Sequence, residues 1–252
     1  YSFPPNLLFL NVSGNTKILK FINLPETIRA INASDTGISS VADLQSANSD
    51  NKFPQLKILD LSKNKNLYTI DGIDERAPGL VNLKLAKCGM LGKVPKIPDT
   101  VEEFDISNNL FTSLTNLPSA LKEFSGKQNK LLTLPSIPAT TRIVDLQGNP
   151  LDEWSLSSVG NLSTKEKSTT NTTYNLEVLN ISNSNNLPEG LDKFTNLKTL
   201  VANDTKIDAG LVQLPSSLET VELNNTGLQN LDGLQSCNNL KKVKASDNNI
   251  IS

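Results

Sequence analysis

The densest group of like-charged side chains in this 252-residue sequence is acidic and consists of Glu102, Glu103 and Asp105. Closely spaced carboxylates can serve acid–base catalysis or bind calcium. Basic residues flank this group on both sides, at Lys84, Lys87, Lys122 and Lys127. Since no concave pocket is implied around them, the pattern favours a solvated binding face over a catalytic or metal site.

The composition excludes most other reactive groups. The chain has no histidine, two cysteines and one tryptophan, so it cannot form a Ser-His-Asp triad, a Cys-His pair or a His-ligated zinc site. The Gly-Lys pairs at 92–93 and 126–127 lack the rest of a phosphate-binding loop. We therefore expect a protein that is not an enzyme and that uses no metal or cofactor.

The overall charge limits the kinds of partner that we expect. A formal charge of −2 and an isoelectric point near 5.3 give no reason to expect nucleic acid or an anionic membrane, because both require a clustered positive surface. No stretch approaches the roughly 18 apolar residues of a membrane span, so membrane attachment would need segments outside this chain. The sequence contains 39 leucines and 31 asparagines, an excess that requires a structural cause.

A nine-residue repeat explains this excess. Eleven copies have an apolar residue at position 4, and all but the copy at Thr141 also have one at position 1. The strongest copies, which share the pattern at positions 1, 4 and 6, are LLFLNVSGN (7–15), LKILDLSKN (56–64), VEEFDISNN (101–109), LKEFSGKQN (121–129) and LKKVKASDN (240–248). Weaker copies start at Ile28, Leu80, Thr141, Leu176, Leu197 and Leu218. Position 9 is never large or charged: Asn15, Thr36, Asn64, Cys88, Asn109, Asn129, Asn149, Ser184, Thr205, Thr226 and Asn248.

This pattern predicts a stack of short parallel strands. Alternate side chains of each strand enter the core, and the polar side chain at position 9 bonds backbone groups of the following turn that would otherwise be unpaired. No single copy can bury its apolar side chains alone, so the copies must stack on one another at about 4.8 Å per strand.

The pattern LxxLxLxxN resembles the leucine-rich-repeat family, and the resemblance covers about 240 of the 252 residues. It implies an α/β-type solenoid with a parallel β-sheet on the concave face and a mostly irregular or extended convex side with little helix. Some repeats, such as LTNLPSAL (114–121), are similar to the short proline-bearing repeats of bacterial effectors, and MLGKVP (90–95) resembles extracellular plant-type repeats.

We expect residues 1–252 to form a single array of about eleven repeats that is a fragment lacking complete caps. A segment rich in serine, threonine, asparagine and lysine interrupts the array at 152–175 and is expected to be a flexible loop, with Trp154 anchoring it. Cys88 and Cys237 fall at inward positions, so both are expected to be lone buried thiols.

The resemblance implies that a partner meets the concave face, whose exposed side chains are those at positions 2, 3, 5, 7 and 8. The candidate partner-binding residues are Lys57, Asp60, Lys84, Lys87, Glu102, Glu103, Asp105, Lys122, Lys127, Arg142 and Asp145. Along position 2, five of the six neighbouring steps pair opposite charges, over Glu102, Lys122, Arg142, Glu177, Lys198, Glu219 and Lys241. Opposite charges on neighbouring strands attract each other, so we expect this charge ladder to be satisfied within the protein.

Seven Asn-x-Ser/Thr sequons are candidates for N-glycosylation: Asn11, Asn32, Asn161, Asn171, Asn180, Asn203 and Asn224. They occur towards both ends and leave the repeats at 56–149 clear. The sequons and MLGKVP favour an extracellular or cell-surface location.

Three functions remain open at this point. The first is a non-catalytic recognition module, the extracellular region of a secreted or receptor-like protein that binds a protein, peptide or glycan on its concave face. The second is the targeting domain of a secreted effector enzyme whose catalytic part, such as a cysteine-dependent ubiquitin ligase, lies outside the chain. The third is a cytosolic scaffold.

Overall fold

The computed structural model describes residues 3–114, 117–133, 136–151, 173–188, 190–207, 210–211 and 213–251. The chain forms two compact units, Tyr1–Leu121 (unit 1) and Lys122–Ser252 (unit 2). Most of the predicted loop at 152–175, including Trp154, and the sequons at Asn161 and Asn171 lie outside the described residues.

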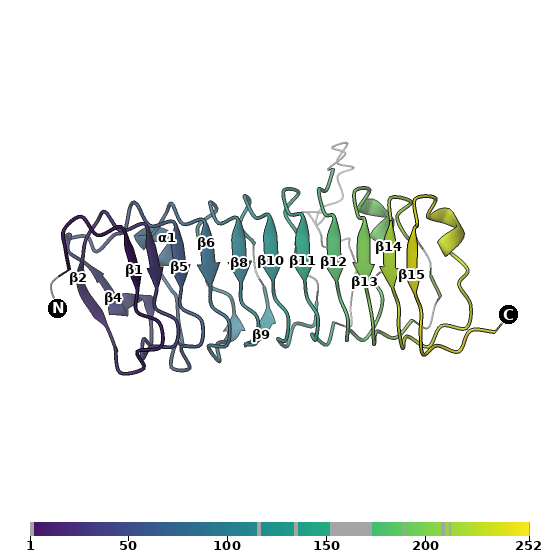
Figure 1. Ribbon diagram of the computed structural model, residues 1–252, viewed down its shortest axis with the longest axis horizontal. Helices are drawn as coiled ribbons and strands as arrows, with labels where there is room; N and C mark the ends of the chain where they lie inside the picture. Colours follow the sequence, from purple (N-terminus) through teal and green to yellow (C-terminus); the bar gives the residue numbers. More distant parts are fainter. Residues whose placement is uncertain are drawn as a thin grey trace, which may run out of the picture. The chain divides into compact units, whose positions relative to one another are not determined.

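Unit 1 is built on short parallel strands, one from each repeat, which stand side by side as a row of arrows in Figure 1. The strands are β1 (Phe9–Asn11), β3 (Ala30–Asn32), β5 (Ile58–Asp60), β6 (Asn82–Lys84) and β8 (Glu103–Asp105). Each strand pairs with the next without a register shift, so that residues at the same repeat position lie beside one another.

Unit 2 repeats this arrangement with its own row of parallel strands. They are β10 (Glu123–Ser125), β11 (Ile143–Asp145), β12 (Val178–Asn180), β13 (Thr199–Val201), β14 (Thr220–Glu222) and β15 (Lys242–Lys244). The register is again position for position, including the pair of strands that flanks the long insertion.

The segments between these strands are mostly extended or irregular. Two small parallel sheets form there, β2 (Phe21–Leu24) with β4 (Leu44–Ser46) and β7 (Leu91–Lys93) with β9 (Leu110–Ser113). The helical segments of the described residues are single turns: η1 (Val41–Asp43), α1 (Ile73–Arg76), η3 (Leu191–Lys193) and η4 (Leu234–Ser236). The predicted solenoid with a parallel sheet and little helix is therefore confirmed. Among the described residues no helix is long and apolar enough to cross a membrane.

The core of each unit consists of the repeat positions that the sequence marks as apolar. The position 4 residues Leu59, Leu83 and Leu200 are fully buried, and the residues at positions 1 and 6 surround them. Burial of apolar surface on this scale is the main term that stabilises a solenoid. Val243 is at position 4 of the repeat that contains β15. It is 41% exposed, because β15 is the last strand of its sheet.

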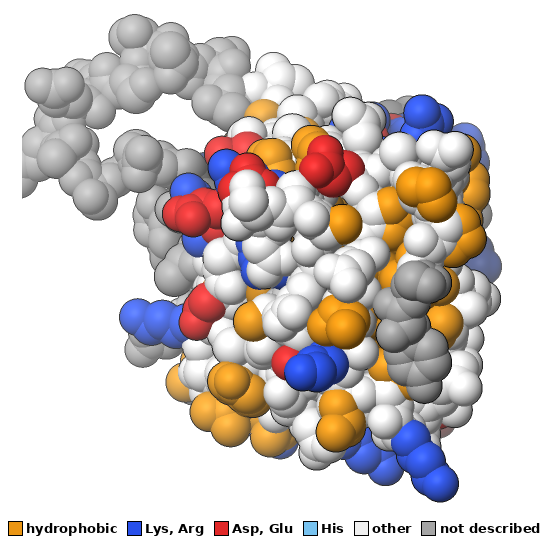
Figure 2. All heavy atoms as spheres, turned by 90° about the vertical axis from the view of Figure 1, so that its left-hand side faces the viewer, with side chains coloured by type: hydrophobic (Ala, Val, Ile, Leu, Met, Phe, Trp, Pro, Cys, Tyr) orange, Lys and Arg blue, Asp and Glu red, His pale blue; other side chains and the backbone are white. Residues whose placement is uncertain are grey.

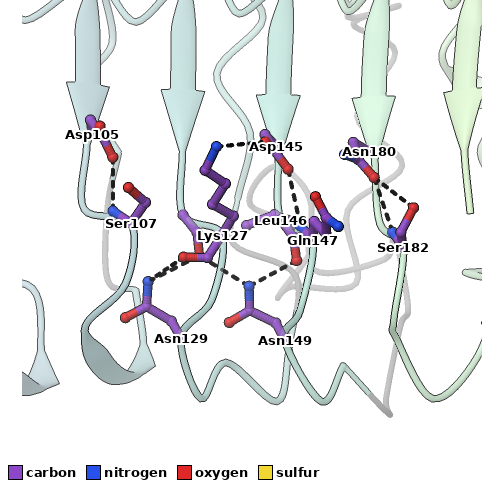
Figure 3. A network of polar contacts seen from close by, with 11 residues as sticks. Asp105, Ser107, Lys127, Asn129, Asp145, Leu146, Gln147, Asn149, Asn180 and Ser182 are labelled. Carbon is purple, nitrogen blue, oxygen red and sulfur yellow. Dashed lines mark hydrogen bonds and ion pairs between the residues drawn. The ribbon is translucent and has the colours of Figure 1, made fainter. Parts of the chain in front are cut away.

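The polar residue at position 9 bonds backbone atoms of two repeats at once. The side-chain nitrogen of Asn109 donates to the carbonyl oxygens of Ile106, in its own repeat, at 2.9 Å and of Leu85, in the preceding repeat, at 2.8 Å. In unit 2, Figure 3 shows the same arrangement for Asn149, which donates to Leu146 and Gly126. The predicted role of position 9 in satisfying buried backbone groups is confirmed.

Position 8 carries a conformational constraint that the pattern LxxLxLxxN leaves unspecified. In all eleven repeats its φ is positive, in the left-handed region. The residues and their φ values are Gly14 (78°), Asp35 (53°), Lys63 (64°), Lys87 (60°), Asn108 (56°), Gln128 (53°), Gly148 (74°), Asn183 (61°), Asp204 (57°), Asn225 (53°) and Asp247 (57°). Every repeat therefore leaves its strand through the same left-handed turn.

Candidate binding face

Each parallel sheet has one face turned away from the core, which corresponds to the concave face of the predicted solenoid. We call it the sheet face, and it carries the side chains of repeat positions 2, 3 and 5. In β8, for example, Glu103 is exposed, Phe104 is buried and Asp105 is half-buried. Position 7 departs from expectation, because Ser107 and Ser182 at this position are buried.

The aspartates and asparagines at position 5 shape the turn after each strand. The Oδ1 atom of Asp60 accepts a hydrogen bond from the backbone N–H of Ser62 at 2.9 Å, and Asp105 and Asp145 accept equivalent bonds from Ser107 and Gln147. Such Asx turns are a structural use of the side chain. One oxygen of each of these three candidate binding residues is thus already engaged within the fold.

The other candidate residues of unit 1 differ in how far they are engaged. Lys57 folds along the surface and donates from Nζ to the carbonyl oxygen of Gly79 at 3.0 Å, and Glu103 accepts a hydrogen bond from the side chain of Asn82. Lys84 lies in register between Asp60 and Asp105 but forms no ion pair with either of them. Lys87 is exposed in the turn that follows β6, and Glu102 is half-buried immediately before β8.

In unit 2 the charges at position 2 form the predicted ladder. Arg142 donates from Nε and one terminal guanidinium nitrogen to the two carboxylate oxygens of Glu177 at 3.1 and 3.2 Å. Lys198 lies 3.8 Å from the same carboxylate, and Lys241 lies 2.7 Å from that of Glu219. The expectation that these charges are satisfied within the protein is confirmed for these pairs.

The ladder changes the titration of its members. The hydrogen bond from Arg142 lowers the pKa of Glu177, and the hydrogen bond from Lys241 lowers the pKa of Glu219. The pKa of Arg142 is raised by the same contact. At position 5, the hydrogen bond from Lys244 lowers the pKa of Glu222. These side chains already form ion pairs with one another, so they would bind a charged partner more weakly than unpaired side chains would.

The remaining candidates of unit 2 lie in its first two repeats. Lys122 is exposed immediately before β10. Lys127 and Asp145 form a loose ion pair with an Nζ–Oδ2 distance of 3.8 Å, as Figure 3 shows. This pair links adjacent repeats, so it too is partly satisfied within the unit.

Apolar side chains interrupt the polar sheet face at position 3. Ile58 on β5 is 45% exposed, and Ile143 on β11 is 38% exposed. At the N-terminal end of unit 1, Leu8 and Phe9 are exposed, with Phe9 at 64%. Figure 2 looks onto this end and shows hydrophobic side chains scattered among polar and charged ones.

Sequence reasoning missed Ile58 on the sheet face and Lys63 in the turn that follows β5. Both stand in the same motif as the candidates Lys57 and Asp60. The signal for Lys63 was the series of residues at position 8, dominated by glycine, asparagine and aspartate, in which a lysine is an exception.

The two cysteines are free and buried, as predicted. Burial raises the pKa of the Cys88 thiol to about 11, and its Sγ donates to the carbonyl oxygen of Leu61 at 3.2 Å. Cys88 therefore remains a neutral thiol near neutral pH. The described residues contain no group of three or more cysteine, aspartate or glutamate side chains arranged to hold a metal ion.

The described sequon asparagines all use their side-chain oxygen within the fold. Asn11, Asn32 and Asn180, at position 5, each accept a hydrogen bond at 3.1 Å from the backbone N–H of the serine two residues later. Asn203 and Asn224, at position 7, accept bonds at 2.9 Å from the next repeat. The side-chain nitrogen of Asn203 also bonds Glu222.

Solved structures with the same fold are leucine-rich-repeat proteins. No protein-family model and no curated protein sequence matches the chain. The structure of the Toll–Spatzle complex from Drosophila contains a chain that is 19% identical with a TM-score of 0.69, the match covering 98% of this chain and 36% of that chain. YopM from Yersinia enterocolitica is 17% identical with a TM-score of 0.53, covering 100% and 62%.

A third similar structure is the ectodomain of the plant membrane receptor kinase GASSHO1/SCHENGEN3 from Arabidopsis thaliana. It is 18% identical with a TM-score of 0.57, covering 90% of this chain and 29% of that chain. This chain thus spans less than two thirds of the length of each of the three proteins. At these identities the similarity concerns the fold, and the chain has the leucine-rich-repeat fold.

Proposed function

We propose that this chain is a non-catalytic recognition module that binds a protein or peptide on the sheet face of unit 1. The observation that carries this proposal is the contrast between the two sheet faces. In unit 2 the charges of the ladder bond one another across neighbouring strands. In unit 1 the exposed Lys84 and Lys87 form no ion pair with any described residue.

The composition of this face suits a peptide or protein partner. Ile58 supplies exposed apolar surface at position 3. Lysines surround it at positions 2, 5 and 8, and the carboxylates of β8 lie two strands away. An apolar centre with a polar rim of mixed charge is the usual composition of a protein-binding surface.

The similar structures support binding of this kind. Toll is in complex with Spatzle, and the GASSHO1/SCHENGEN3 ectodomain is in complex with CASPARIAN STRIP INTEGRITY FACTOR 2. We extend this mode of use to the present chain and place it outside the cell or at the cell surface, with N-glycans at some of its sequons. A loss of mass after enzymatic deglycosylation of the protein from its native source would support this location, and an unchanged mass would count against it.

A second candidate is the targeting domain of an effector whose catalytic part lies elsewhere. The proline-bearing repeats favour it, and YopM matches the whole of this chain. In unit 1 two of these prolines take part in the turn that leads into the next repeat. The N–H of Val101 donates to the carbonyl oxygen of Pro98, and the N–H of Leu121 donates to that of Pro118. The two candidates share the binding face and differ in the setting, which the deglycosylation experiment distinguishes.

The experiment for the binding face uses selection from a displayed random peptide library. Peptides are enriched on the wild-type protein and then tested against the sheet-face variant Ile58→Glu/Lys84→Glu. A matched control, Leu91→Glu/Lys93→Glu, makes the same charge change on exposed β7, away from the sheet face. Our proposal predicts that binding is lost in the first variant and kept in the control. Equal binding by both variants, or loss in the control alone, would overturn it.

A further inference from the structure

Two lysines of unit 1 occupy a backbone conformation that suits lysine poorly. Lys63 and Lys87 are at position 8, with φ values of 64° and 60°. Eight of the eleven residues at this position are glycine, asparagine or aspartate, the types that adopt the left-handed region most readily. Holding a long side chain there costs conformational free energy that an asparagine or glycine would largely avoid.

The two lysines are also neighbours. The backbone N–H of Lys63 donates to the carbonyl oxygen of Ala86 at 2.6 Å, and that of Lys87 donates to Ser107 at 2.9 Å. The register of β5 and β6 therefore continues into the turns and places Lys63 beside Lys87. Like charges on directly neighbouring strands repel each other, which adds a second unfavourable contribution.

Nothing in the described part of the chain neutralises this pair fully. Asp35 precedes Lys63 at position 8 and Asn108 follows Lys87, so the two lysines face one carboxylate among their direct neighbours at this position. Neither lysine forms an ion pair with a described residue. The residues that precede the turn at position 7, Ser62, Ala86 and Ser107, are small and uncharged, so they add no opposite charge.

We propose that Lys63 and Lys87 form a paired cationic contact for an acidic peptide segment of the protein partner, an inference that rests on the function proposed above. The unfavourable conformation and repulsion are offset when carboxylates of the partner lie between the two ammonium groups. Lysine acts as a flexible point charge, which suits carboxylates on an extended peptide, whereas recognition of phosphate favours the fork of arginine.

The surroundings of the pair argue against a long polyanion. Glu103 and Asp105 lie on β8, the strand next to β6, and Asp60 lies on β5. A nucleic acid or sulfated glycan running along the face would meet these carboxylates and be repelled. A peptide can place acidic residues over the lysine pair and neutral or basic residues over β8.

The experiment measures binding of a labelled oligoglutamate peptide, with oligoglutamine, single-stranded RNA and a heparin fragment as comparison probes. The variant Lys63→Asn/Lys87→Asn removes both charges while keeping residues that tolerate positive φ. The control Lys20→Asn/Lys193→Asn removes two exposed lysines elsewhere. We expect the first variant to weaken oligoglutamate binding about tenfold and the control to leave it within about twofold. Equal effects of the two variants, or tighter binding of RNA or heparin than of oligoglutamate, would overturn the proposal.

A second readout separates this role from a structural one. Because Lys63→Asn/Lys87→Asn relieves conformational strain and repulsion, its midpoint of thermal unfolding should rise by about 2–4 °C while its binding falls. A structural role for the lysines predicts a lower midpoint instead, and that result would also overturn the proposal.

The peptides selected on the sheet face distinguish failure of this inference from failure of the proposed function. If they lose binding in Ile58→Glu/Lys84→Glu but not in Lys63→Asn/Lys87→Asn, the proposed function stands and the lysine contact is wrong. If they depend on neither variant, both proposals are wrong. Loss of binding in both variants, with enrichment of acidic sequences, supports both.

Discussion

The side-chain oxygen of Asn109 accepts a hydrogen bond from the backbone N–H of Cys88, one repeat earlier, at 3.0 Å. The same oxygen accepts the N–H of Met90 at 3.1 Å. Asn109 therefore satisfies two buried donors of the preceding turn, while its nitrogen satisfies carbonyl groups of both repeats. Since each repeat depends on its neighbour in this way, stability accumulates at the contacts between repeats.

Replacing this asparagine should be costly. We expect Asn109→Ala to lower the free energy of unfolding by about 2–4 kcal/mol, because buried donors and acceptors are left without partners. Denaturant titration followed by circular dichroism measures the change. Asn66→Ala, at an exposed asparagine two repeats earlier, is the control and should change it by less than about 0.5 kcal/mol. A small effect at Asn109 would show that water or a neighbouring group replaces the amide.

Among the residues at position 9, Cys88 is expected to form weaker hydrogen bonds to the backbone than the asparagines do. Asn64 and Asn109, on either side, each bond backbone groups of the preceding repeat through an amide oxygen and nitrogen. Cys88 offers a thiol, which is a weaker donor and acceptor. We expect Cys88→Asn to raise the free energy of unfolding by about 1 kcal/mol. Cys237→Asn is the contrasting variant, because Cys237 is buried but lies outside position 9, so a buried amide there should be destabilising.

The sequence predicts the repeat architecture well because the constraint on positions 1, 4, 6 and 9 concerns side-chain type. Once the register is fixed, the ladder of Arg142 and Glu177 follows directly, even across the long insertion. The constraint on position 8 concerns φ and not the type of side chain. Because Lys63 and Gln128 also occupy this position, the motif alone does not predict the left-handed turn. The Asx turns were missed for a related reason, since the charge of Asp60 or Asp105 drew the interpretation towards a partner.

The charge ladder predicts how unit 2 responds to acid. The pKa values of Glu177, Glu219 and Glu222 are lowered by their basic partners. Glutamates with lowered pKa values stabilise the folded state above their unfolded pKa, and this contribution is lost as the pH falls below 4.5, the ordinary value for glutamate.

We therefore expect Arg142→Gln/Lys241→Gln to flatten the loss of stability between neutral pH and acid, measured as the midpoint of thermal unfolding at a series of pH values. The control Lys193→Gln should keep the slope of the wild-type protein. Added salt should reduce the difference between the variants, because these pairs are exposed. An unchanged slope in the double variant would mean that the ladder contributes nothing to stability.

The left-handed turn gives a prediction at position 8 of unit 2. Asn183 has a φ of 61° and an exposed side chain. A β-branched residue is strained in this region, so Asn183→Val should lower the free energy of unfolding by about 1–3 kcal/mol, and Asn183→Gly should be close to neutral. Asn185→Val, two residues later and outside the left-handed region, serves as the control. Equal stability of the two valine variants would contradict the proposed constraint.

Thr141 is the one residue at position 1 that is not apolar, and the structure shows no compensation for this. It is fully buried, and its hydroxyl has no hydrogen-bond partner among the described residues. Its counterparts in the repeats on either side, Leu121 and Leu176, are buried leucines. A buried hydroxyl without a partner costs about 1–3 kcal/mol.

Valine has nearly the same shape as threonine, so Thr141→Val should remove this cost without creating a cavity. We expect the free energy of unfolding to rise by about 1–2 kcal/mol in denaturant titration. Thr195→Val, at an exposed threonine, should change it by less than about 0.5 kcal/mol. Destabilisation by Thr141→Val would contradict this prediction. It would show that the hydroxyl forms a hydrogen bond in solution and that a polar residue at position 1 stabilises this repeat.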